Sequence, residues 1–135
     1  LVMFLSKLDV KQKNLFLDVC IAISKCDDDF CEKEASLIGE FCNEMAIDFR
    51  DEIEHPVEEA IEELAVVLNS EQKKMVLLET AGIVMVDKVI APKEKAILEN
   101  MIASFGLSRG EYEKILLLIN RLYDCYALLA NYIRQ

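Results

Sequence analysis

The acidic stretch DDDFCEKE, from Asp27 to Glu34, has a counterpart sixty residues later in DKVIAPKE, from Asp87 to Glu94. The surrounding sequence corresponds as well, because eight of the 35 positions from 8 to 42 are identical to the residue sixty positions further on, without a gap. Self-similarity at one fixed offset is typical of a repeated supersecondary unit. The sequence therefore predicts two related helix-loop-helix units, at approximately 8–47 and 68–107. The identical pairs are Leu8 with Leu68, Gln12 with Gln72, Lys13 with Lys73, Leu17 with Leu77, Ile23 with Ile83, Asp27 with Asp87, Lys33 with Lys93 and Glu34 with Glu94.

Each unit is expected to open with a capped helix. Asp9 and Asn69 carry side chains that accept hydrogen bonds from free N–H groups at a helix start. Gln12 and Gln72 follow three residues later, where each can reach back to the backbone of the capping residue. Apolar residues then recur at spacings of three and four, which is the period of an α-helix. The first helices should span about 11–26 and about 71–86, and the second helices should begin near residues 32 and 92.

Two more helices are predicted outside these units. Pro56 suits the first turn of a helix that continues to about residue 68. Gly106 suits a left-handed helix end, and Ser108 with Glu111 forms a capping box for a final helix from about 109 to 132. The apolar residues of that last helix cover most of one side, so we expect it to pack along both helix-loop-helix units.

The composition favours one all-α domain covering residues 1–135. The chain has 53% hydrophobic and 30% charged residues but only four Gly and two Pro, which argues against disorder and against a turn-rich β protein. A domain of 135 residues can bury a substantial core without disulfides or a structural metal. The predicted fold class is therefore an all-α bundle of two related units with a long C-terminal helix.

The formal net charge of -10 bears on the choice of partners. A strongly negative protein repels nucleic-acid phosphates and anionic lipid headgroups, so we expect no nucleic acid as a ligand. Metal cations, or a protein partner with a basic face, fit this charge better. The acids at 58, 59, 62 and 63 occupy one face of the linker helix, where they are either a solvated surface or a docking face.

Cysteine usage and hydropathy indicate a cytoplasmic protein. The five cysteines are odd in number and include no CxxC pair, which favours reduced thiols in the core. A zinc site is not expected, because the single His55 stands beside Pro56 in an acidic stretch. The longest apolar stretches are interrupted well before the roughly 20 residues that a membrane span requires, so no membrane insertion is expected.

Asp27, Glu34, Asp87 and Glu94 have two interpretations. Either the Asp residues close one helix while the Glu residues open the next, or the four carboxylates supply oxygen ligands to Ca²⁺ or Mg²⁺. An enzyme is not expected, because the sequence has no Ser-His-Asp set, no glycine-rich phosphate loop and no paired-His metal motif.

The spacing of an Asp, an apolar residue three positions on and a Glu seven positions on resembles the TerB-like family, which is named for a tellurite-resistance protein. The matching residues are Asp27, Phe30 and Glu34, and the same pattern recurs at Asp87, Ile90 and Glu94. With the flanking helices, the likeness covers roughly residues 4–133. Family members typically have Gly after the Asp, where this chain has Asp28 and Lys88.

The resemblance implies an all-α bundle of paired hairpins, a role in stress response or in an assembly at the inner face of the membrane, and an acidic cation site. With the negative charge, it leads to a non-catalytic interaction module that binds a protein with a basic face. The alternative is a divalent-cation-binding protein that uses the two acidic loops.

Overall fold

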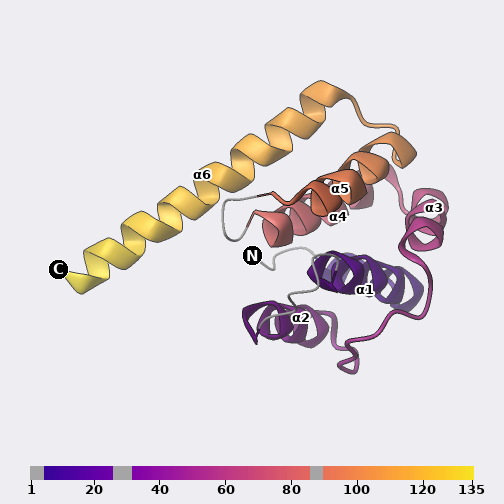
Figure 1. Ribbon diagram of the computed structural model, residues 1–135, viewed down its shortest axis with the longest axis horizontal. Coiled ribbons are helices and arrows are strands. Elements are labelled where there is room, and N and C mark those ends of the chain that lie inside the picture. The colour runs from indigo at the N-terminus through magenta and orange to yellow at the C-terminus, as the bar shows by residue number, and fades with distance from the viewer. Residues whose placement is uncertain (1–4, 26–31, 86–89) are drawn as a thin grey trace.

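The computed structural model describes residues 5–25, 32–85 and 90–135, with only the backbone described for 32–35. Every regular element in these ranges is a helix, and none is a strand (Figure 1). The predicted all-α class is therefore confirmed. The predicted starts of the helices agree with the observed starts to within one residue. The elements are a 3-10 turn η1 (Leu5–Lys7), α1 (Val10–Lys25), α2 (Glu32–Met45), α3 (Val57–Val67), α4 (Ser70–Val84), α5 (Pro92–Ser104) and α6 (Arg109–Arg134).

Helices α1 and α4 begin with the predicted reciprocal caps. Asp9 Oδ1 accepts from the Gln12 N–H at 2.8 Å, and the Asp9 N–H donates to Gln12 Oε1 at 2.9 Å. Asn69 and Gln72 repeat both bonds, at 2.8 and 3.0 Å. The two glutamine amides also lie 3.3 Å apart, within hydrogen-bond distance of each other. The N-termini of α1 and α4 therefore lie side by side and satisfy each other's capping side chains.

Helices α2 and α5 end in the same backbone motif. After α2, Ala46 adopts a φ of 56°, and the Ile47 N–H donates to the Cys42 carbonyl at 3.0 Å. After α5, Gly106 adopts a φ of 71°, and the Leu107 N–H donates to the Ile102 carbonyl at 3.0 Å. Each is a Schellman motif, in which one left-handed residue lets the next N–H reach back to the last turn. Gly is favoured there, so Ala46 is strained and Gly106 is not.

Opposite substitutions at these two positions should therefore change stability in opposite directions. Ala46→Gly should raise the free energy of unfolding by about 0.5–1 kcal/mol, because relief of the left-handed strain exceeds the extra entropy that Gly loses on folding. Gly106→Ala should lower it by about 1 kcal/mol. An added Cβ at Gly106 would meet no atom within 4 Å, so the loss comes from the backbone alone. Urea unfolding of both variants tests this, and changes of the same sign would contradict it.

The core lies where α1 meets its neighbours. α1 packs against α3, α2 and α4, while α4 packs against α5 and α6. Phe16 of α1 and Phe41 of α2 are almost completely buried and meet edge to face, with ring centroids 5.9 Å apart. From α3, Ile61 and Leu64 are fully buried. Among the described elements α1 is therefore the central helix, with buried residues that face several neighbours.

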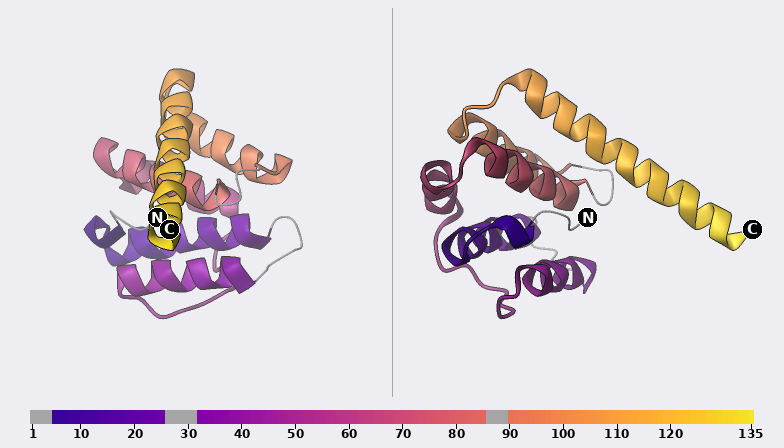
Figure 2. Two further views of the ribbon diagram at one scale, coloured as in Figure 1. Left: turned by 90° about the vertical axis from the view of Figure 1, so that its left-hand side faces the viewer. Right: turned by 180° about the vertical axis from the view of Figure 1, so that it is seen from behind.

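The final helix packs differently from the prediction. Only its first half is covered, with Tyr112, Ile115 and Ile119 buried against the body and the Tyr123 hydroxyl donating to the Gly82 carbonyl of α4. From Tyr126 onward α6 extends beyond the other helices (Figure 2). The expectation that it packs along both units is wrong, because α6 packs mainly against α4 of the second predicted unit and its C-terminal half is exposed.

Candidate functional site

The four predicted cation ligands are described only in part. Asp27 and Asp87 lie outside the described residues, and Glu34 stands in the first turn of α2 with its side chain outside them. Glu94 stands in the first turn of α5, where its Oε1 accepts from the Ala91 N–H at 3.3 Å. The predicted role of opening a helix is confirmed for Glu94. Within the described part of the chain no three His, Cys, Asp or Glu side chains are arranged to hold a metal ion, and the loop site stays a prediction.

A buried carboxylate in α1 holds the segment between α2 and α3 in place. The Asp18 side chain is fully buried, and its Oδ1 accepts from Arg50 Nη1 at 2.7 Å and from the Glu54 N–H at 2.8 Å. Its Oδ2 lies 2.9 Å from Nδ1 of His55. A buried carboxylate needs such partners, because loss of hydration is otherwise uncompensated. The three contacts bind residues 50–55 to the middle of α1.

Arg50 extends this network to the backbone. Its Nη2 donates to the Asn14 carbonyl at 2.9 Å, its Nη1 also donates to the Glu52 carbonyl at 2.8 Å, and its Nε lies 3.0 Å from Glu54 Oε1. The Arg50 side chain is 19% exposed, so its charge is largely removed from water. A guanidinium in a fixed fork geometry fixes the direction of several neighbouring groups at once. These bonds hold the segment between α2 and α3 in one conformation, and residues 46–56 are called the strap below.

Residue periodicity alone did not predict this cluster. Asp18 follows Phe16 and Leu17 and precedes Val19, so its position in the buried part of α1 was visible in the sequence. Its partners Arg50, Glu54 and His55 are 32 to 37 residues away, beyond any local pattern. The available signal was one acid inside an apolar run, together with the single Arg of an otherwise acidic segment.

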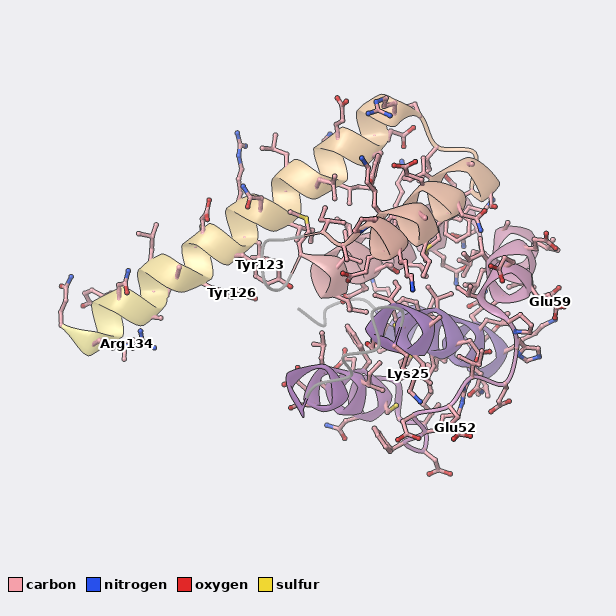
Figure 3. All side chains as sticks on the ribbon, viewed as in Figure 1. Lys25, Glu52, Glu59, Tyr123, Tyr126 and Arg134 are labelled. Atoms are coloured by element: carbon pink, nitrogen blue, oxygen red, sulfur yellow. The ribbon has the colours of Figure 1, made fainter. Side chains whose placement is uncertain are left out.

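The strap and α3 together present an acidic surface. Lys11 of α1 forms an ion pair with this surface, with Nζ 2.7 Å from Glu63 Oε1, and both groups are solvated enough to make this pair weak. Figure 3 shows Glu52 on the strap and Glu59 on α3 at the same side of the molecule. This surface is called the acidic face below. Its members, all exposed except the half-buried Glu63, are Asp48, Asp51, Glu52, Glu54, Glu58, Glu59, Glu62 and Glu63.

Two apolar side chains interrupt the acidic face. Phe49 is 56% exposed and Ile53 is 47% exposed, although each could have been replaced by a polar residue on a purely solvated strap. Ile53 lines a hollow of about 350 Å³ together with Ile21 and Lys25 of α1. A second hollow, of about 370 Å³, lies toward the other end of α1 beside His55 and Glu59. The acidic face therefore combines carboxylates, apolar side chains and concave surface.

The cysteines of the core are poorly suited to thiolate chemistry. Burial raises the pKa of the Cys20 thiol well above its ordinary value, and the nearby Glu79 carboxylate and Cys42 raise it further. Burial also raises the pKa of Cys42. Because the thiolate is the reactive form, the raised pKa values lower the reactivity of both thiols near neutral pH. Cys20 and Cys42 are the predicted free core thiols, whereas Cys125 is free but exposed on α6, and Cys26 and Cys31 lie outside the described residues.

Comparisons of this chain with protein-family models, with curated proteins and with solved structures found no match. The resemblance to the TerB-like family therefore stays a prediction that depends on the two short acidic patterns. Among the described residues, no helix is both long enough and apolar enough to cross a membrane.

Proposed function

We propose that this protein is a non-catalytic interaction module, and that its acidic face binds a protein partner with a basic face. The observation that carries the proposal is the anchoring of the strap by the buried Asp18, with its contacts to Arg50, to the Glu54 N–H and to His55. A buried carboxylate fixes a surface segment whose own side chains face solvent. An ordered segment loses less conformational entropy on binding than a loose loop does.

The chemistry of the acidic face suits a partner helix or loop that is both basic and apolar. Carboxylates around the rim attract Lys and Arg and speed association. Phe49 and Ile53 supply exposed apolar contacts, and most of the binding energy of an interface comes from a few such anchors. The hollow beside Ile53 can receive one apolar side chain of the partner. The carboxylates of the acidic face would thus attract the partner, and its apolar side chains and hollow would supply most of the affinity.

We further propose that residues 8–47 and 68–107 are two related units of a TerB-like bundle that acts in a stress response of the tellurite-resistance type. The structural support is the constant offset of sixty between equivalent features. α1 and α4 begin at 10 and 70, α2 and α5 begin at 32 and 92, and the left-handed residues are 46 and 106. Equal capping and equal termination at one offset are expected of two copies of a hairpin.

Capture from native cytosol tests the interaction, with the protein as bait and with crosslinking at moderate ionic strength. The face variant carries Glu58→Gln, Glu59→Gln and Glu62→Gln. The matched control carries Glu40→Gln, Glu44→Gln and Glu99→Gln, which neutralise three exposed carboxylates outside the acidic face. We expect the wild type and the control to retain a basic protein, and the face variant to lose it.

The bound protein should also elute as the salt concentration rises, because exposed charge pairs are screened. Equal capture by both variants would contradict the role of the acidic face. Retrieval of no protein by the crosslinked wild-type bait would contradict the proposed function itself.

A further inference from the structure

Helix α6 carries a regular apolar stripe along its whole length. Its residues recur at alternating spacings of three and four, which is the a/d pattern of a helix that packs against another helix. The helix is 26 residues long, so the stripe passes through three heptads. The seven consecutive stripe positions are Tyr112, Ile115, Ile119, Leu122, Tyr126, Leu129 and Ile133.

The body of the protein covers only the beginning of this stripe. Tyr112, Ile115 and Ile119 are buried, whereas Tyr126, Leu129 and Ile133 are 47%, 57% and 78% exposed. Figure 3 shows Tyr126 following Tyr123 along the part of α6 that leads to Arg134, away from the other helices. Residues 120–134 are called the tail below, and Leu122, Tyr126, Leu129 and Ile133 are called the seam. The seam continues a packing surface that is already in use.

The charge of α6 differs from that of the rest of the chain. α6 carries four Lys or Arg against three Asp or Glu, while residues 1–108 carry 11 against 22. The tail itself has Arg121, Asp124 and Arg134, and the a/d pattern places all three on the side of the helix opposite the seam. The tail is thus a region with no excess negative charge on a strongly acidic molecule.

We propose that the seam is covered by the tail of a second copy of this chain, so that two molecules pair through their tails. An apolar seam is self-complementary, as an interface with two-fold symmetry requires. The charge distribution favours the tail as the place where two copies meet. Two copies with a net charge of -10 repel each other over most of their surfaces, but their tails can approach without meeting like carboxylates.

The pairing differs in its salt dependence from binding through the acidic face. Salt screens the repulsion between the two acidic bodies, so the dimer should become tighter as ionic strength rises. A basic partner on the acidic face should bind more weakly under the same change. The two interactions are also separated in space, because α3 and the strap lie at the opposite side of the body from the tail (Figure 1).

Sedimentation equilibrium of the whole chain over a range of concentrations tests the proposal. The wild type, of 15.4 kDa, should approach twice that mass with increasing concentration. Leu129→Lys should raise the dissociation constant of the dimer by about tenfold or more, because it places a charge in the seam. The matched control is Leu128→Lys, at the neighbouring residue, which is 68% exposed and lies off the seam. The control should change the constant by less than about threefold.

Circular dichroism of both variants establishes that α6 and the bundle still form, so that a lost dimer reflects the seam and not unfolding. A wild-type mass of 15.4 kDa at every concentration would overturn the proposal. Equal effects of the two lysines, or weakening of the dimer by salt, would do the same. Association of a monomeric wild type with vesicles of neutral lipid would also overturn it, and would assign the seam to a membrane surface instead.

Discussion

Replacing Asp18 with Ala is expected to lower the free energy of unfolding by about 3–5 kcal/mol, which is the range for breaking a buried ion pair by removing one partner. The substitution leaves the Arg50 guanidinium, which is only 19% exposed, beside a cavity without its closest carboxylate. It also leaves the Glu54 N–H without the acceptor that it has at 2.8 Å. Urea unfolding at neutral pH measures the change, and the strap should become more sensitive to protease digestion.

Two further variants isolate the cause. Asp51→Ala removes an exposed carboxylate from the same segment and should change stability by less than about 0.5 kcal/mol. Asp18→Ala combined with Arg50→Met should be more stable than Asp18→Ala alone, because the largely buried guanidinium that has lost its buried carboxylate is removed as well. If the double variant is no more stable than Asp18→Ala, the contribution of Asp18 to the free energy of unfolding comes from packing and not from the ion pair.

The helices were predictable from the sequence because the signals that start and stop them are local. Asp9 with Gln12 and Asn69 with Gln72 form their bonds within four residues, and each pair places a helix start correctly. The sequence did not single out Ala46 as the left-handed residue after α2, because Ala has no preference for that conformation. Its role follows from the backbone hydrogen bonds of residues 42–47.

The candidate site was harder to predict because its contacts are distant in sequence. The acidic residues of α3 were visible as one helical face, and that face is solvated as the period predicts. The anchoring of the strap required Asp18 and Arg50 to meet across 32 residues, which no local period encodes. The tail was also only partly predictable from the sequence. An apolar stripe predicts that a helix face is to be covered, but not how far the covering surface extends.

A pair of phenylalanines separates stability from binding. Phe41→Ala should lower the free energy of unfolding by about 3–5 kcal/mol, because it leaves a cavity beside Phe16 in the contact between α1 and α2. Phe49→Ala should change it by less than about 0.5 kcal/mol, because that ring is 56% exposed on the strap. Urea unfolding of the two variants provides the measurement.

The same two variants address the proposed function when they are used as baits for the basic partner. Phe49→Ala should fold normally and retain less of the partner, since an exposed ring on an ordered acidic face is a candidate anchor. Phe41→Ala should retain the partner in proportion to its folded fraction, because residue 41 is 1% exposed and cannot touch a bound protein. A Phe49→Ala bait that captures as much partner as the wild type would limit the acidic face to electrostatic attraction. In that case the carboxylates alone, acting on a basic surface, would account for the binding. The partner should then be almost entirely released at high salt.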